Sequence, residues 1–240
     1  MQPSDLSGRV ALVTGANRGI GLAVVEGIAE RGATTLLGAR DLARGEEAAG
    51  ALRARGLAVH ALQLDVADRA SIAAAVSAID ARHGRLDVLV NNAGLLAYDS
   101  AIDLDPDTAD LFWRTNTLGP WILAAAAIPL MRRNGWGRIV NVTSEMASLE
   151  RMGASGPSYR VSKTALNAVT RVLAAELAAD PADSGILVNA TSPGWVRTEM
   201  GGEDAPRSIE QGAASILFGV DLPDGGSSGG FFQDGAPLPW

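Results

Sequence analysis

The chain of 240 residues has no cysteine, a single lysine, two histidines and two tyrosines. The absence of cysteine excludes disulfides, thiol nucleophiles and thiolate metal sites. The two histidines, His60 and His83, lie far apart in the sequence. This scarcity argues against a Ser-His-Asp triad and against a histidine-rich metal site, so we expect no bound metal.

The sequence also lacks an excess of positive charge and a long hydrophobic run. Its formal charge of −7 argues against nucleic acid as a partner, because phosphate binding needs a basic face. The longest strongly apolar run, residues 121–131, is too short to cross a bilayer and contains Pro129. The N-terminal residues MQPSDLSGR do not form a signal-peptide pattern. We therefore expect a cytoplasmic protein without a membrane partner.

Apolar, β-branched runs alternate with helix-like segments along the whole chain, and no linker or change of composition divides it. This alternation predicts an α/β fold in one domain, residues 1–240: a doubly wound Rossmann fold whose parallel sheet is covered by helices on both faces. Strands are expected at residues 9–15, 34–39, 58–66, 85–94, 137–144, 185–194 and 229–234. Helices are expected at residues 19–32, 41–55, 68–83, 106–134, 157–179 and 206–219, with a bend near Gly119-Pro120 in the fourth.

The segment TGANRGIG, residues 14–21, lies between the first strand and the first helix. Its glycines, Gly15, Gly19 and Gly21, allow a tight turn and a close approach to a pyrophosphate, which the N-terminus of the helix attracts. A glycine-rich loop alone is weak evidence, but the strand–turn–helix context strengthens it. We predict a dinucleotide-binding loop.

Basic residues favour NADP(H) over NAD as the dinucleotide. NAD-binding proteins place an acidic residue at the end of the second strand, whereas Ala39 and Arg40 stand there in this sequence. Arg18, Arg40 and Arg44 could bind a 2′-phosphate. Arg44 could instead be a solvated helix residue, and Asp41 is either an NAD signal or, more simply, a helix cap.

The only lysine, Lys163, follows Tyr159 by four residues in the segment YRVSK. Residues at positions i and i+4 of a helix share one face, so both side chains should point the same way. A nearby ammonium lowers the pKa of a phenol toward the range in which proton transfer is efficient. We expect Tyr159 to act as acid/base and Lys163 as its partner. The alternative is a surface lysine beside a structural tyrosine.

Three polar residues that precede this pair in the sequence stand at positions suited to an active site. Ser144 ends the fifth strand and could donate a hydrogen bond to a substrate carbonyl. Asn116, inside the long helix, could hold a kink and a water molecule near Lys163, or could be a structural amide. Asp65 could bind the adenine amino group or cap the next helix.

Together, TGANRGIG, NNAG, Asn116, Ser144, YRVSK and PGWVRT resemble the short-chain dehydrogenase/reductase family over essentially the whole chain. The segments LLGARDLARG and GGFFQDGAPLPW resemble its carbonyl-reductase branch, which uses NADPH. The resemblance implies a seven-stranded sheet. It also implies that residues 193–196 and Thr198 hold the nicotinamide carboxamide and phosphates, and that Asn116 holds a water molecule.

The resulting prediction names four catalytic residues, Asn116, Ser144, Tyr159 and Lys163. The residues expected to contact the cofactor are Gly15, Asn17, Arg18, Gly19, Ile20, Gly21, Arg40, Asp65, Val66, Asn92, Ala93, Gly94, Tyr159, Lys163, Pro193, Gly194, Val196 and Thr198. The residues expected to line the substrate pocket, beside a loop at about 195–210, are Leu95, Leu96, Tyr98, Glu145, Met146, Met152 and Trp195. Each of these could instead serve packing, and Glu145 could face solvent.

We therefore predict NADPH-dependent reduction of a small ketone or aldehyde. The alternatives are an NAD-dependent alcohol or sugar dehydrogenase of the same family, a non-catalytic NADPH-sensing protein, and a dehydratase or epimerase. Ser144 and Tyr159 lie slightly further apart than is usual in the family, so the segment 145–158 could reshape the pocket. The chain lacks an insertion that blocks association in animal carbonyl reductases, which implies a homodimer or homotetramer. The expected contact surface is formed by residues 106–134 and 157–179, including Val161, Ala165, Ala168, Val169 and Val172.

Overall fold

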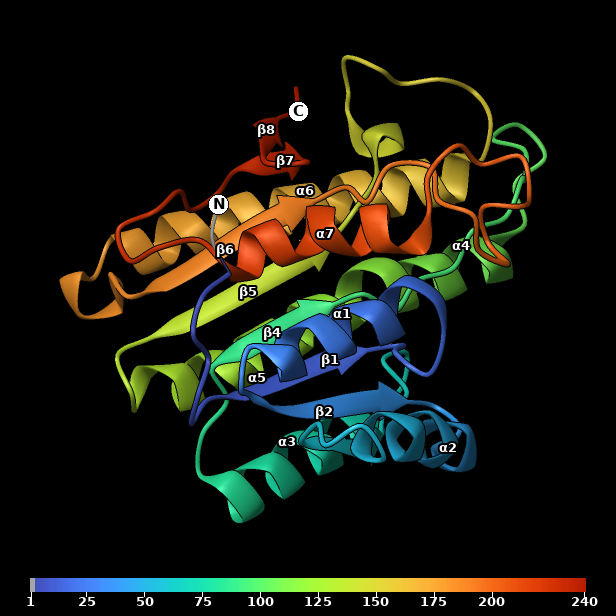
Figure 1. The fold of residues 1–240 in the computed structure, drawn as a ribbon. Coiled ribbons are helices and arrows are strands. Elements are labelled where there is room, and N and C mark those ends of the chain that lie inside the picture. The colour runs from blue at the N-terminus through green and yellow to red at the C-terminus, as the bar shows by residue number, and fades with distance from the viewer. Residues whose placement is uncertain (1–2) are drawn as a thin grey trace.

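Seven parallel strands and one short antiparallel strand form the central sheet of the computed structural model, which describes residues 3–240 (Figure 1). The strand order is β3-β2-β1-β4-β5-β6-β7-β8. The strands are β1 (Val10–Thr14), β2 (Thr34–Ala39), β3 (Val59–Gln63), β4 (Val88–Asn91), β5 (Gly137–Val142), β6 (Ile186–Thr191), β7 (Phe231–Gln233) and β8 (Ala236–Pro237). This arrangement confirms the doubly wound Rossmann fold.

The eighth strand corrects the predicted number of seven. It pairs with β7 through a tight turn at Asp234 and Gly235, both of which have positive φ angles. Such Asp-Gly turns match the twist of a hairpin, so the last residues of the chain fold back along β7. The short length of β8 hid it from the apolar pattern.

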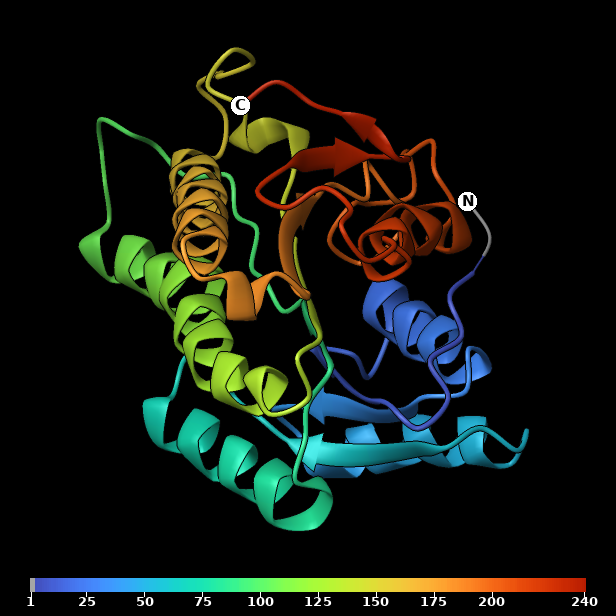
Figure 2. The same cartoon turned by 90° about the vertical axis from the view of Figure 1, so that its left-hand side faces the viewer.

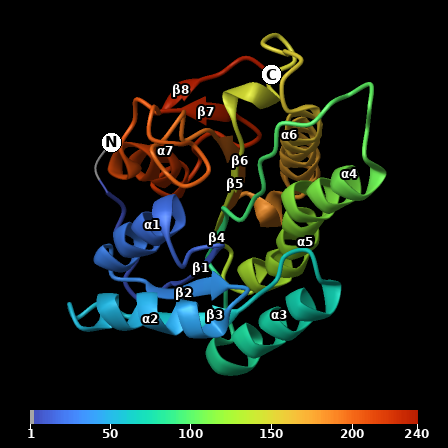
Figure 3. The same cartoon turned by 90° about the vertical axis from the view of Figure 1, so that its right-hand side faces the viewer.

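Helices cover both faces of the sheet, as Figures 2 and 3 show from two sides. Two apolar clusters fill the spaces between the sheet and these layers, one under α3, α5 and α6 and the other under α1, α2 and α7. None of the helices within residues 3–240 is long and apolar enough to span a membrane. The helices are α1 (Gly19–Glu30), α2 (Leu42–Arg53), α3 (Arg69–His83), α4 (Pro106–Trp113), α5 (Gly119–Arg132), α6 (Pro157–Ala178) and α7 (Ile209–Val220).

The predicted helix over residues 106–134 is interrupted by a π-helical turn, Arg114–Leu118, between α4 and α5. This turn precedes the bend expected at Gly119-Pro120. Gly119 packs so closely on the backbone of Val66 that a larger residue would clash with its carbonyl. The turn places Asn116 inside the protein, and π-bulges of this kind are frequent at functional sites.

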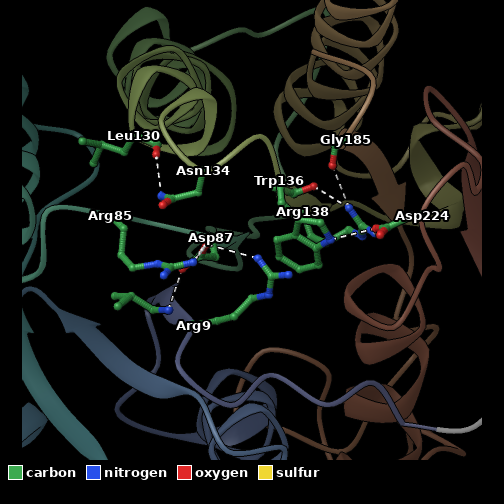
Figure 4. A network of polar contacts seen from close by, with 11 residues as sticks. Arg9, Arg85, Asp87, Leu130, Asn134, Trp136, Arg138, Gly185 and Asp224 are labelled. Atoms are coloured by element: carbon green, nitrogen blue, oxygen red, sulfur yellow. Dashed lines mark hydrogen bonds and ion pairs between the residues drawn. The ribbon is translucent and has the colours of Figure 1, made fainter. Parts of the chain in front are cut away.

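A polar network closes the amino ends of the central strands, at the edge opposite the one that receives ligands in such sheets (Figure 4). The Asp87 carboxylate is fully buried and accepts hydrogen bonds from Arg85 and from the Val10 N–H. Arg9 lies 3.4 Å from the same carboxylate, and its guanidinium stacks 3.6 Å from the ring centre of Trp136. The network therefore joins the starts of β1, β4 and β5.

Removing the charge of Asp87 should destabilise the protein without altering the opposite edge of the sheet. We expect Asp87→Asn to lower the free energy of unfolding by about 3 kcal/mol, because it removes the buried anion that binds the partly buried Arg85 and Arg9 and the buried Val10 N–H. Asp80→Asn removes the exposed ion pair with Arg133 and should cost less than about 1 kcal/mol. Urea unfolding of both variants measures the difference, and equal losses would show that the Asp87 network contributes no more than a surface pair.

Candidate active site

The site is built from loops that follow four neighbouring strands, β1, β4, β5 and β6. Because these strands are parallel, their carboxyl ends meet at one edge of the sheet. After β1 the next strands are added on one side of β1, and after β4 they are added on the opposite side of the sheet. The order in which strands are added therefore reverses between β1 and β4. The predicted cofactor and catalytic residues after these strands are thus brought to one edge.

The glycine loop after β1 has the geometry of an anion-binding turn. A Cβ added to Gly15 would lie 2.8 Å from the Cα of Ala93, and one added to Gly21 would lie 2.5 Å from Nδ2 of Asn92. The first turn of α1 contains no acidic residue, and its N-cap, Arg18, makes no side-chain capping bond. The N–H groups and positive dipole end of α1 are therefore available to a phosphate.

The basic residues near this loop differ in their partners. Asp41 caps α2 by accepting hydrogen bonds from the N–H groups of Ala43 and Arg44, which supports the helix-cap interpretation. Arg44 lies 3.6 Å from the Asp41 carboxylate, and Arg18 pairs with Glu199. Arg40 is exposed at the end of β2. Arg40 is therefore placed to contact a part of a dinucleotide that extends beyond the glycine loop.

The segment after β4 serves mainly to hold the glycine loop. Asn92 donates its side-chain amide to the carbonyl oxygens of Thr14 and Gly15, at 2.9 and 3.1 Å. The Thr14 hydroxyl accepts the N–H groups of Asn92 and Ala93. The preceding Asn91 bonds to Asn141 of β5 at 2.8 Å. A cofactor-contact role for Asn92 and Ala93 stays a prediction, and their observed role is to join two loops.

Asp65 and Val66 follow β3 and are held by local contacts. The Asp65 side chain accepts a hydrogen bond from the Ala67 N–H at 2.9 Å, whereas Asp68 caps α3. Asp65 therefore shapes the turn before the helix without being its cap. Val66 is buried in the apolar cluster under α3. An adenine contact at this position stays a prediction.

The loop after β6 reaches the glycine loop. Gly194 has a positive φ angle and donates its N–H to Ser192, while Val196 forms an isolated bridge with Arg207. A Cβ added to Gly19 would lie 3.7 Å from the methyl group of Thr198. With the Arg18–Glu199 pair, this contact places residues 194–199 across the glycine loop, as the predicted binding of a dinucleotide requires.

Tyr159 lies in the first turns of α6 and is 8% exposed. Burial raises the pKa of its phenol, a hydrogen bond with the Ser144 side chain lowers it in part, and the nearby Tyr98 raises it further. Lys163 is not among the causes of this shift, so the effect of its ammonium on the Tyr159 phenol stays a prediction. The phenol is held in its protonated form at neutral pH, within reach of Ser144.

Lys163 is 3% exposed, so the alternative of a surface lysine is wrong. Its ammonium donates a hydrogen bond to the carbonyl of Val142 at 2.8 Å. Burial lowers the pKa of Lys163 to about 8. A Cβ added to Gly94 would lie 3.3 Å from both Lys163 Nζ and Asn116 Oδ1, so the absence of a side chain there leaves room for both groups.

Asn116 is completely buried in the π-helical turn. Its Oδ1 accepts the Leu95 N–H at 2.8 Å, and its Nδ2 donates to the Leu95 carbonyl and the Ser162 hydroxyl, both at 3.0 Å. Both amide hydrogens are thus used, while Oδ1 keeps a second lone pair. The structural-amide interpretation is confirmed by these contacts, and the water-holding role stays a prediction.

The predicted substrate residues differ in their exposure. Tyr98, Met152 and Trp195 are well exposed, at 76%, 42% and 57%. Glu145 forms an ion pair with Arg151 at 2.8 Å, and its side chain is exposed to solvent, as the alternative interpretation expected. Leu95, Leu96 and Met146 are partly buried. The exposed side chains of Tyr98, Met152 and Trp195, here called the rim, are aromatic or apolar. Their contact with substrate stays a prediction.

Two residues beside the site, Asp99 and Arg160, were not among the predicted site residues, although Arg160 lies within the segment YRVSK. Asp99 accepts hydrogen bonds from the backbone N–H and the hydroxyl of Ser158, in the first turn of α6. The N-cap of that helix, Gly156, has no side chain to do so. Arg160 binds the segment between β5 and α6. Each contact joins residues that are separated in the sequence, so no local sequence pattern marks it. Within residues 3–240 no cluster of His, Asp or Glu is arranged to hold a metal ion.

The family model for short chain dehydrogenases matches residues 9–208, so the chain belongs to the short-chain dehydrogenase family of oxidoreductases. Among curated relatives, carbonyl reductase (NADPH) 1 of Sus scrofa is 35% identical over 97% of this chain and 94% of its own length. The crystal structure of NADPH-bound carbonyl reductase from chicken fatty liver has a TM-score of 0.88 at 28% identity, covering 100% of this chain and 97% of that chain. A gluconate 5-dehydrogenase from Burkholderia cenocepacia, in complex with NADP and tartrate, has a TM-score of 0.82 at 29% identity, covering 96% and 95%.

Proposed function

We propose that this protein reduces a ketone or aldehyde to an alcohol with NADPH. One observation carries the proposal: a buried phenol, Tyr159, lies beside the Ser144 hydroxyl at the edge of the sheet that bears the glycine loop. The similarity to carbonyl reductases supports the direction and the substrate class. Mixing the protein with NADPH and a panel of aldehydes, ketones and diketones tests it, since loss of NADPH absorbance with none of them would contradict it.

The residues present fit NADPH. The uncapped N-terminus of α1 would take the pyrophosphate, and the loop after β6 would lie along the nicotinamide half. Arg40 and Arg18 would bind the 2′-phosphate, because guanidinium groups bind phosphates through paired hydrogen bonds. NADPH, when bound, supplies the hydride that reduces the carbonyl carbon.

The side chains of this protein would polarise the carbonyl and deliver the proton. The Ser144 oxygen accepts the Met146 N–H at 3.2 Å, and its one hydrogen, which binds the Tyr159 oxygen in this structure, would donate to a substrate oxygen instead. Tyr159 would give its proton to the alkoxide as it forms, and a raised phenol pKa keeps that proton in place beforehand. The positive charge of Lys163 would then favour the phenolate that is left behind.

Replacing Arg40 tests the preference for NADPH. We expect Arg40→Ala to weaken NADPH binding by about tenfold or more, because a charge-assisted phosphate contact contributes about 1.5–3 kcal/mol, and to leave NADH binding nearly unchanged. Arg44→Ala is the matched control, since Arg44 already faces Asp41. Fluorescence titration with both cofactors gives the dissociation constants. Equal weakening of NADPH and NADH by Arg40→Ala would argue against a 2′-phosphate contact at this residue.

The second candidate is oxidation of an alcohol or sugar derivative, which the similarity to a gluconate 5-dehydrogenase favours. The exposed apolar rim of Tyr98, Met152 and Trp195 argues for a less polar substrate. Incubation with gluconate and either NAD or NADP separates the two functions. A non-catalytic NADPH sensor is disfavoured because Tyr159 and Lys163 are both present and buried together.

We further propose that the protein forms a homodimer or homotetramer through α4, α5 and α6. Trp113, Trp121, Val161 and Val172 on these helices are 41–63% exposed, which is unusual for large apolar side chains. Val169, expected on the same surface, instead packs in the core. A monomer in sedimentation equilibrium would contradict this proposal.

A further inference from the structure

The segment between β5 and α6, residues 143–156, carries three of the predicted pocket residues, Glu145, Met146 and Met152. It begins with a 3₁₀ turn, Glu145–Ala147, and continues without regular secondary structure. Its internal backbone bonds are short-range: the Arg151 N–H binds the Ser148 carbonyl, and the Met152 N–H binds the Leu149 carbonyl. Contacts from outside the segment determine how it lies relative to the catalytic residues, and one of these is the Trp240 carbonyl, which accepts the Glu150 N–H and the Ser148 hydroxyl, both at 3.3 Å.

Arg160 supplies long-range contacts to this segment. Its Nε donates to the Ser155 carbonyl at 2.7 Å, and its Nη1 donates to the carbonyls of Met146 and Arg151 at 3.1 and 3.4 Å. Its Nη2 lies 3.2 Å from where a Cβ on Gly153 would be. One planar guanidinium thus contacts the beginning, middle and end of the segment.

The position of Arg160 next to Tyr159 makes these contacts relevant to substrate binding. Both residues belong to the first turns of α6, so the proton donor and the anchor of the pocket segment are parts of one rigid element. Thr164, one turn further, donates its hydroxyl to the Ala147 carbonyl at 2.9 Å and secures the start of the segment. A shift of the segment would move Met146 and Met152 relative to Tyr159.

Resting on the function proposed above, we infer that Arg160 is a positioning residue that sets the size of substrate the pocket accepts. It acts through the segment 145–156 and does not touch the reacting atoms. A lysine cannot replace it, because a single ammonium on a flexible stem lacks the planar set of donors that reaches three carbonyl oxygens. The inference concerns substrates large enough to contact Met146 or Met152.

The test compares the wild type with Arg160→Lys and Arg160→Met, using butanone as a small ketone and benzil as a bulky aromatic one. We expect both variants to raise KM for benzil about tenfold, with kcat for butanone and the NADPH dissociation constant within about twofold of the wild type. Arg133→Met, which removes a remote exposed arginine paired with Asp80, controls for the loss of a positive charge.

Limited trypsin digestion in the presence of NADPH gives a second, structural readout. Cleavage after Arg151 should be faster in both Arg160 variants, because the Arg151 carbonyl loses its contact with the guanidinium. Unchanged cleavage and an unchanged KM for benzil would overturn the inference. An equal loss of activity with both ketones, together with a lower melting temperature, would also overturn it by showing a purely structural role. A wild type that reduces neither ketone would contradict the proposed function. The trypsin digestion would still test whether Arg160 holds the segment in place.

Discussion

Tyr159→Phe should lower kcat for ketone reduction by roughly 10²–10⁴-fold, the usual contribution of a positioned general acid. The substitution removes one oxygen from a side chain that is 8% exposed, so the packing around α6 should persist. Binding of NADPH should also persist, because the glycine loop and the loop after β6 are unaffected. Stopped-flow measurement of NADPH oxidation gives kcat, and fluorescence titration gives the dissociation constant.

The chain provides its own control for this experiment, since Tyr98 is the only other tyrosine. Tyr98 is 76% exposed and lies near Tyr159, whose pKa it raises. Tyr98→Phe should therefore keep kcat within about threefold of the wild type, since a rim residue affects mainly binding. A Tyr159→Phe variant as active as Tyr98→Phe would remove Tyr159 from the mechanism.

Lys163→Met should lower kcat by roughly 10²–10³-fold, a loss typical of removing a preorganised charge or donor that stabilises a developing anion. Methionine fills the buried position without supplying a charge for the phenolate of Tyr159. Lys163→Arg should not restore activity, because the space beside Gly94 is too narrow for a guanidinium. Restored kcat in the arginine variant would show that charge alone suffices at this position.

The Lys163→Met variant should also show how the buried charge of Lys163 affects protein stability. The pKa of Lys163 is about 8 in the folded protein against 10.5 for the unperturbed group. Between these two values the unfolded chain binds more protons than the folded chain, so the free energy of unfolding of the wild type rises with pH. Relative to Lys163→Met, the wild type should gain about 2 kcal/mol between pH 8 and pH 10. Urea unfolding at both pH values measures the gain, and a parallel pH dependence of the two proteins would show an unperturbed lysine.

The order of strands and helices, and the edge of the sheet that carries the site, could be predicted from local features. Apolar runs mark buried strands, and the residues after β1, β4 and β5 must meet because parallel strands end together. The helix cap at Asp41 and the tie between Asn91 and Asn141 were predictable for the same reason. Each depends on a short segment and its position in a known pattern.

Features that depend on tertiary packing could not be predicted. The pKa of Tyr159 is raised chiefly because its phenol is buried, and this burial cannot be read from the spacing of four residues to Lys163. The hydrogen bond from Lys163 to the Val142 carbonyl joins α6 to β5. The three carbonyl contacts of Arg160 require a particular path of the segment before α6. The π-helical turn around Asn116 likewise reflects its hydrogen bonds to Leu95 and Ser162.

Transfer of deuterium from NADPH that carries two deuterium atoms at C4 of the nicotinamide to the carbonyl carbon of a ketone tests the central claim most directly. Mass spectrometry of the alcohol formed should show one deuterium per molecule with the wild type and with Tyr98→Phe. Tyr159→Phe should bind the labelled cofactor with normal affinity and form almost no alcohol in the same time. An unlabelled alcohol, or equal labelling by Tyr159→Phe, would contradict a hydride transfer that depends on the Tyr159 proton.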